Sequence, residues 1–180
     1  MAMQLLPRVL IPESKIKERI CEIASEIAFD YKGKELTAIC VLKGSFIFFA
    51  DVIRQIDVPM NCEFMGLSSY GNKTVSTGEV KLTLDLTEPL HGKHVIVIED
   101  IVDTGLTMQY LVNTLKARKP ASLKVCALLA KPERLICSLE IDYVGFKLGS
   151  EFVVGYGLDH AGKHRQLPYI GVIEHEPYNS

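Results

Sequence analysis

The sequence lacks tryptophan, a marked excess of either charge and any long apolar segment. Because 20 basic residues face 22 acidic ones, the formal net charge of -2 gives no broad positive field for nucleic acid. No apolar run approaches the roughly 20 residues that cross a bilayer, and the opening MAMQLLPRVLIP is interrupted by Pro7, Arg8 and Pro12, unlike a signal peptide. We therefore expect no nucleic-acid partner and no membrane partner, and any anionic ligand must be bound by a local cluster.

The sequence also lacks cysteines at the spacings typical of disulfides or zinc sites. The chain has 5 cysteines, an odd number with no CxxC spacing, and most lie inside apolar runs: Cys21, Cys40, Cys62, Cys126 and Cys137. This usage argues against a disulfide framework and against common zinc motifs, and is typical of reduced, buried thiols. We expect a cytoplasmic protein.

The chain has enough apolar residues for one core. With 180 residues and 48% hydrophobic composition, we expect a single domain over residues 1–180. Apolar residues at helical spacing follow Ser14, a candidate N-cap, and predict a helix to about residue 30. Residues 36–42 then predict a strand, 43–45 a tight turn and 46–56 a largely buried helix.

Later segments predict more strands than helices. Residues 62–67, 80–86 and 123–129 have strand patterns, and shorter ones follow at 141–146, 152–156 and 169–173. The polar stretch 68–79 is longer than the about two to five residues of a hairpin loop, which leaves a functional lid and simple disorder as alternatives. The alternation predicts an α/β fold with a mostly parallel central sheet and an attached smaller layer.

The most informative segment is VIVIEDIVDTGLTM, residues 95–108. Its four consecutive β-branched residues predict a strand covered on both faces. Small or hydroxylic residues follow, and apolar residues at helical spacing then predict a helix from about 107 to 118. Backbone amides and hydroxyls at such a strand-to-helix turn can converge on an anion.

The acids in this segment need a separate explanation. Glu99, Asp100 and Asp103 would repel a bare phosphate, unless ribose hydroxyls or a divalent cation also bind there. The alternative is a solvated loop in which the acids have no ligand, but this leaves the threonines and glycine beside them unexplained. The pattern therefore favours a metal-bound phosphorylated sugar.

The same segment resembles the phosphoribosyl-pyrophosphate (PRPP) motif of the purine phosphoribosyltransferases, and among them the bacterial-type hypoxanthine (hypoxanthine-guanine) phosphoribosyltransferases. Three further segments agree with the resemblance: VLKGS at 41–45 with the pyrophosphate loop, SSYGNKTVSTGE at 68–79 with the flexible lid, and EFVVGYGLDHAGKHRQLPYIGVI at 151–173 with the purine-binding end. The resemblance implies a type I phosphoribosyltransferase fold with a small hood built from the two ends of the chain.

That family's activity implies a role for each group in the motif. Phosphoribose would pass from PRPP to N9 of hypoxanthine, and of guanine, releasing pyrophosphate, with Mg²⁺ as cofactor. By resemblance, Glu99 and Asp100 hold the ribose hydroxyls, directly or through the metal. The 5′-phosphate would be bound by the loop Asp103, Thr104, Gly105, Leu106 and Thr107. Asp103 is the candidate catalytic residue, accepting or relaying a proton of the purine ring.

Other matched residues would bind pyrophosphate and the base. Lys43 and Gly44 resemble the pyrophosphate turn, with a cis peptide bond expected between Leu42 and Lys43. Arg165 would also contact pyrophosphate, because its planar guanidinium suits phosphate oxygens. The remaining matches are Ser69 and Tyr70 in the lid, Lys131 as donor to the purine O6, Phe152 stacking on the base, and Val153, whose backbone would contact the edge of the base. Asp159 would lie beside the base and help to bind Mg²⁺ on the pyrophosphate side.

Some features depart from the family or leave alternatives open. Leu106 stands where mammalian members carry lysine, which is typical of a bacterial-type member. A regulator that keeps the PRPP pocket without catalysis, and a relative with another base specificity such as xanthine, are the competing hypotheses. The helix at 46–56 is apolar nearly all round, so it is either deep core or a subunit contact, and we expect a homodimer or homotetramer.

Overall fold

The computed structural model describes residues 7–69 and 80–173. A central sheet of six strands has the order β4-β3-β2-β5-β6-β7, and a second sheet of three strands has the order β1-β9-β8. The strands are β1 (Arg8–Ile11), β2 (Leu36–Leu42), β3 (Met60–Ser69), β4 (Val80–Leu84), β5 (His94–Val102), β6 (Ser122–Ala130), β7 (Tyr143–Lys147), β8 (Val153–Val154) and β9 (Ile170–Val172). The helices are α1 (Glu13–Asp30), α2 (Phe46–Ile53), α3 (Leu106–Lys116) and the short 3₁₀ turn η1 (Pro132–Arg134).

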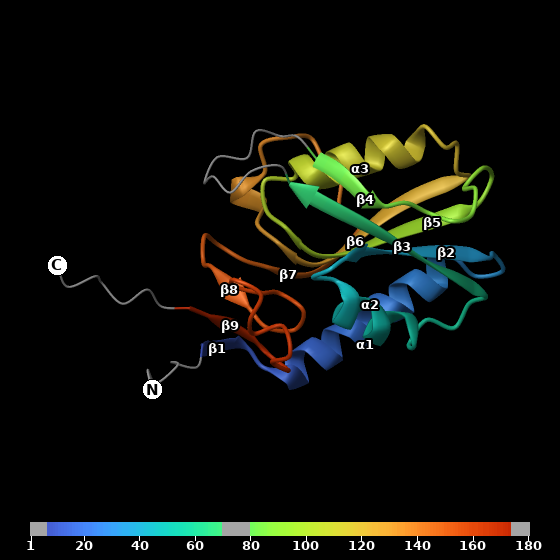
Figure 1. The fold of residues 1–180 in the computed structure, drawn as a ribbon. Helices are drawn as coiled ribbons and strands as arrows, with labels where there is room; N and C mark the ends of the chain where they lie inside the picture. The colour runs from blue at the N-terminus through green and yellow to red at the C-terminus, as the bar shows by residue number, and fades with distance from the viewer. Residues whose placement is uncertain (1–6, 70–79, 174–180) are drawn as a thin grey trace.

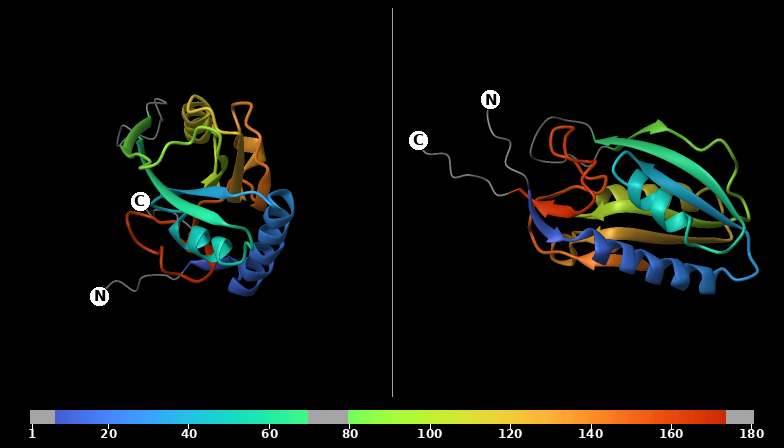
Figure 2. Two further views of the ribbon diagram at one scale, coloured as in Figure 1. Left: turned by 90° about the vertical axis from the view of Figure 1, so that its right-hand side faces the viewer. Right: turned by 90° about the horizontal axis from the view of Figure 1, so that it is seen from below.

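The central sheet is mostly parallel, as the sequence predicts. Strands β3, β2, β5, β6 and β7 pair in parallel, and only β4 runs antiparallel to its neighbour β3. Figure 1 shows α3 over one face of the sheet and α1 with α2 over the other. The three-stranded sheet lies at one end of the central sheet, and we call it the hood; the views in Figure 2 place it on the side of α1 and α2.

The central strand β5 is buried on both faces. Ile96 and Ile98 pack into the cluster formed with α1 and α2, whereas Val95 and Val97 pack into the cluster formed with α3. Alternate residues of a strand point to opposite faces, so four apolar residues in a row supply both cores. All four are fully buried, which confirms the predicted strand.

Several predicted boundaries were wrong by a few residues. Helix α1 begins at Glu13 after Pro12, so Ser14 lies in the first turn and is not the N-cap. The φ of Pro12 is -71°, close to the helical value that the proline ring fixes. Helix α2 ends at Ile53 rather than at residue 56. Strand β1 was not predicted, because its four residues acquire strand structure by pairing with β9.

The order of the strands decides where a ligand can bind. Strands β2 and β5 are neighbours although β3 and β4 lie between them in the sequence, and the chain continues to opposite sides from this pair. In open α/β sheets, ligands bind beyond the carboxyl ends of strands at such a switch point. The segments after β2, β5 and β6 therefore meet at one edge. Within the described residues, no helix has the length and apolarity to cross a bilayer.

Candidate active site

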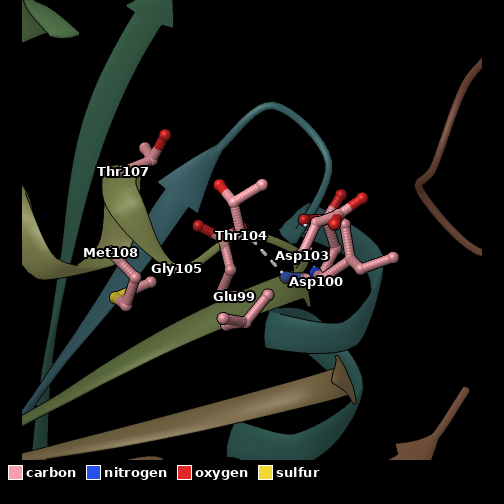
Figure 3. Close-up of a pocket in the computed structure, with 9 residues that line it drawn as sticks. Glu99, Asp100, Asp103, Thr104, Gly105, Thr107 and Met108 are labelled. Carbon is pink, nitrogen blue, oxygen red and sulfur yellow. Dashed lines mark hydrogen bonds between the residues drawn. The ribbon is translucent and has the colours of Figure 1, made fainter. Parts of the chain in front are cut away.

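A cavity of about 200 Å³ lies where β5 ends and α3 begins. Figure 3 shows its wall, which the acids at the end of β5, Thr104 in the following turn and Thr107 in the first turn of α3 form from adjacent parts of the backbone. Six of the seven residues predicted to bind ribose phosphate line it: Glu99, Asp100, Asp103, Thr104, Gly105 and Thr107. Leu106, the first residue of α3, is the exception and does not line the cavity.

Gly105 gives the phosphate turn its shape. It caps α3 with a φ of 83°, a left-handed conformation that glycine adopts readily. A Cβ at this position would also lie 2.7 Å from Sγ of Cys137 and 2.9 Å from Cδ2 of Leu135. The first amides of a helix have no intrahelical acceptor, so the start of α3 can offer donors to an anion in the cavity.

Two adjacent carboxylates lie at the end of β5, where Glu99 is buried and Asp100 is half-buried. The backbone amide of Asp100 donates to Oε1 of Glu99 at 3.0 Å, and that of Ile101 donates to Oδ1 of Asp100 at 2.7 Å. Burial raises the pKa of Glu99 well above its usual range, and the neighbouring charge of Asp100 adds to this effect. Burial likewise raises the pKa of Asp100. A ligand that brings hydroxyl donors or positive charge would relieve the cost of holding these charges.

The turn after β2 lies against this acid pair. The peptide bond between Leu42 and Lys43 is cis, as predicted. A Cβ on Gly44 would lie 1.6 Å from Oδ2 of Asp100, so the backbone of the turn directly contacts that carboxylate. A Cβ on Gly157 would in turn lie 2.0 Å from the carbonyl oxygen of Gly44. The predicted pyrophosphate turn is therefore packed between the acids and the loop after β8.

Lys131 joins the other side of the site. Its side chain is buried at 4% exposure, and Nζ donates to the carbonyl oxygen of Glu151 at 2.7 Å. The same Nζ lies 3.7 Å from Oδ2 of Asp103. Phe152 follows Glu151 and is half-exposed, with its ring edge-on to His160 at 5.3 Å, whereas Val153 is buried in β8. Of the predicted base-binding residues, Lys131 thus lies next to Asp103 and also contacts the segment that carries Phe152 and Val153.

Arg165 links the loop after β8 to the acids. Its Nη2 lies 2.6 Å from Oδ1 of Asp159, and its Nη1 donates to the carbonyl oxygen of Gly157 at 2.6 Å. The positive charge of Arg165 lowers the pKa of Asp100, partly offsetting the effect of burial. Oδ2 of Asp159 accepts a hydrogen bond from the amide of Gly162 at 2.7 Å, so both oxygens of this carboxylate already have partners.

A known protein family matches most of the chain. A family profile described as "Phosphoribosyl transferase domain" matches residues 12–161. The chain belongs to the phosphoribosyltransferase family. It is 45% identical over 175 residues to a hypoxanthine-guanine phosphoribosyltransferase of Bacillus subtilis, covering 97% of each chain. It is 44% identical over 168 residues to a hypoxanthine phosphoribosyltransferase of Haemophilus influenzae, covering 92% of this chain and 94% of the relative.

Longer relatives and solved structures agree on the subfamily. The chain is 45% identical over 174 residues to a bifunctional TilS/HprT protein of Listeria innocua, but covers only 27% of that relative. A crystal structure of a hypoxanthine-guanine phosphoribosyltransferase from Bacillus anthracis, with a HEPES molecule in its active site, superposes with a TM-score of 0.90. That structure is 46% identical, and the match covers 94% of this chain and all of the other. The predicted phosphoribosyltransferase fold and subfamily are confirmed.

Some residues of this phosphoribosyltransferase were missed or cannot be placed. Arg134, which the sequence reasoning did not single out, lies with Nε 2.6 Å from Oδ1 of Asp103. Arg134 follows Lys131 by three residues, with Pro132 between them. This spacing indicates a tight turn that places both side chains on the same side. Of the two lid residues, Ser69 ends β3 and Tyr70 lies outside the described residues, so their roles stay predictions.

Proposed function

We propose that this chain transfers the phosphoribosyl group of PRPP to N9 of hypoxanthine, and also of guanine, giving IMP or GMP and pyrophosphate. The observation that carries the proposal is the placement of Asp103. It lies between the acid pair Glu99 and Asp100 with the predicted phosphate-binding turn on one side and a buried lysine beside the predicted base segment on the other. The names of the relatives from B. subtilis and H. influenzae support the same activity.

The residues of the cavity would bind the sugar phosphate. Ribose hydroxyls donate hydrogen bonds to carboxylates, which suits Glu99 and Asp100. The turn from Asp103 to Thr107 offers backbone amides and threonine hydroxyls to the 5′-phosphate. Lys43, the amide of Gly44 and Arg165 would bind the pyrophosphate, with Ser69 and Tyr70 closing over it. Holding both ends of PRPP fixes the anomeric carbon relative to the base.

In the proposed transfer, one bond forms at C1′ as another breaks. The bond between N9 and C1′ forms as the bond between C1′ and the pyrophosphate oxygen breaks, and the electron pair of the broken bond leaves with pyrophosphate. The purine ring loses one proton, and the carboxylate of Asp103 would accept it. Lys131 would donate to O6 of the base. Adenine carries an amino donor at that position, so it would leave both donors unsatisfied.

Mg²⁺ is part of the proposal. Within the parts of the chain that the structure describes, no group of three or more His, Cys, Asp or Glu side chains could hold a metal ion alone. Two carboxylates with substrate oxygens and water are nevertheless the usual surroundings of Mg²⁺, and the raised pKa values of Glu99 and Asp100 fit a site that a cation completes. The ion would neutralise charge on the pyrophosphate. Asp159 is predicted to help bind Mg²⁺ on the pyrophosphate side, which would require its present bonds to change.

The proposal extends to setting and assembly. The free cysteines fit a reducing cytoplasm. We further propose a single domain and a homodimer or homotetramer, for which half-exposed Phe46 and Phe64 near α2 offer apolar surface. A regulator without catalysis is not supported, because the compared relatives are named as transferases.

The decisive test supplies the purified protein with PRPP and Mg²⁺ and one base at a time. Hypoxanthine, guanine, xanthine, adenine, uracil and orotate would be compared by chromatography of the nucleotide and by release of pyrophosphate. We expect turnover with hypoxanthine and guanine. The rate with adenine should be lower by at least about a thousandfold. The Asp103→Asn variant from the same preparation controls for a contaminating enzyme. Absence of nucleotide with every base would refute the proposed function.

A further inference from the structure

Arg134 reaches the same carboxylate as Lys131 because of a short turn. The sequence KPER places Pro132 at the start of η1, and the amide of Arg134 donates to the carbonyl oxygen of Lys131 at 3.0 Å. A 3₁₀ turn repeats every three residues, so side chains three apart leave it on the same side. Lys131 and Arg134 both end beside Asp103, which lies in the turn after β5.

The two cations contact different oxygens of Asp103. Nε of Arg134 lies 2.6 Å from Oδ1, whereas Nζ of Lys131 lies 3.7 Å from Oδ2. Oδ1 is buried, and within the described residues it has no well-aligned hydrogen bond, so its contact with Arg134 is an ion pair. Oδ2 is on the side of Lys131, which also contacts the carbonyl of Glu151, next to Phe152.

A purely structural role does not explain this contact well. The side chain of Arg134 is 47% exposed and that of Asp103 is 38% exposed. Ion pairs between partly exposed side chains contribute little to stability, since solvent screens the charges. A flexible carboxylate in a loop, however, can rotate about two side-chain bonds, and a proton acceptor must be held within hydrogen-bond reach of its donor. The pair is suited to fixing orientation.

We propose that Arg134 is a positioning residue for Asp103, an inference that rests on the proposed function. By holding Oδ1, it keeps Oδ2 turned toward the base beside Lys131, where it accepts the proton that the purine ring loses. Arg134 itself does not touch the ring or the pyrophosphate. The turn that carries the O6 donor thus also aligns the proton acceptor, so binding of the base and proton transfer depend on one short segment.

The test compares Arg134→Gln and Arg134→Lys with wild type and with Glu133→Gln, an exposed neighbour in the same turn. Because a misplaced catalytic group can cost about a hundredfold, we expect Arg134→Gln to lower kcat with hypoxanthine about 10- to 100-fold. The KM for PRPP and the melting temperature should stay near wild type, and Arg134→Lys should recover part of the loss. Glu133→Gln should match wild type.

A double variant separates positioning from other effects. In an Asp103→Asn background, Arg134→Gln should change kcat less than about twofold, since the group that it positions is already disabled. The inference is overturned if Arg134→Gln alone keeps the wild-type kcat, if its loss appears in full in the Asp103→Asn background, or if the loss follows a lowered melting temperature. In each case an active wild type and Glu133→Gln would leave the proposed function standing. Inactivity of both would overturn the proposed function and the inference together.

Discussion

The backbone of Gly44 lies directly against the carboxylate of Asp100, so that a Cβ on Gly44 would lie 1.6 Å from Oδ2. No side chain fits between them. The turn after β2 and the end of β5 are therefore in contact at the point where pyrophosphate and ribose would be bound together. This contact explains the glycine at position 44 by space alone.

Replacing this glycine tests the contact. Gly44→Ala must displace either the turn or the carboxylate of Asp100, so we expect the KM for PRPP to rise about tenfold or more, with a smaller effect on the base. Steady-state kinetics with varied PRPP would measure this. Gly149→Ala is the matched control, because its Cβ would meet only the end of the flexible Glu151 side chain, at 3.0 Å. An unchanged KM in Gly44→Ala would mean that PRPP binding does not need this packing.

Much of the fold and part of the site could be predicted from local patterns. Four β-branched residues before Glu99 predicted a strand buried on both faces, and Val95 to Ile98 are fully buried. The small residues after them predicted the turn into α3, where Gly105 has a φ of 83°. These features depend on neighbours in the sequence, which is why the sequence alone is sufficient. The cis bond before Lys43 was predicted from the family resemblance and is also confirmed.

Several particular contacts between distant segments could not be predicted. The packing of Gly157 on the carbonyl of Gly44 joins residues more than a hundred positions apart, and no residue type at either position indicates it. The pairing of β1 with β9 is equally remote, and four residues carry too weak a pattern alone. Arg134 is exposed in a polar turn, where an arginine is unremarkable until Asp103 is seen beside it. Tertiary structure determines such contacts.

Lys131 provides a test of base specificity. Lys131→Met keeps the length and most of the volume of a buried side chain but removes the donor to O6. We expect kcat/KM for hypoxanthine to fall about 100-fold or more, because a lost polar contact leaves the base oxygen unsatisfied, while adenine use falls much less. Initial rates with hypoxanthine and with adenine would measure the two changes in kcat/KM. An equal loss with both bases, or a similar rise in the KM for PRPP, would point to a general defect instead.

Asp103→Asn tests the proposed proton acceptor. The amide is nearly the same size but is a poor base, so we expect turnover to fall about 10²- to 10⁴-fold, the range of general-base contributions. The affinity for PRPP should change little, since the backbone amides of the phosphate turn remain. Rapid-quench measurement of nucleotide formation would separate the chemical step from product release. Turnover at the wild-type level would remove Asp103 from the chemistry.

Glu99 makes the stability of the ligand-free protein depend on pH. Burial raises its pKa in the folded chain above the usual 4.5, so the folded state binds the proton more tightly than the unfolded state. The stability that this provides is complete below pH 4.5, and it declines as the pH rises until the folded pKa is passed. Glu99→Gln has no proton to lose. We therefore expect its melting temperature, relative to wild type, to rise with pH and to exceed the wild-type value at pH 8.

Thermal denaturation from pH 4 to pH 9 without Mg²⁺ or PRPP would measure the effect, with Glu133→Gln as the exposed control. The control should follow the wild-type curve, because Glu133 is exposed in the folded state. Adding Mg²⁺ and PRPP should reverse the order at pH 8, since these ligands favour the ionised carboxylate, and wild type should gain more stability than Glu99→Gln. Parallel curves for Glu99→Gln and wild type across the whole range would show that Glu99 ionises at the same pH in the folded and unfolded states, contrary to its burial.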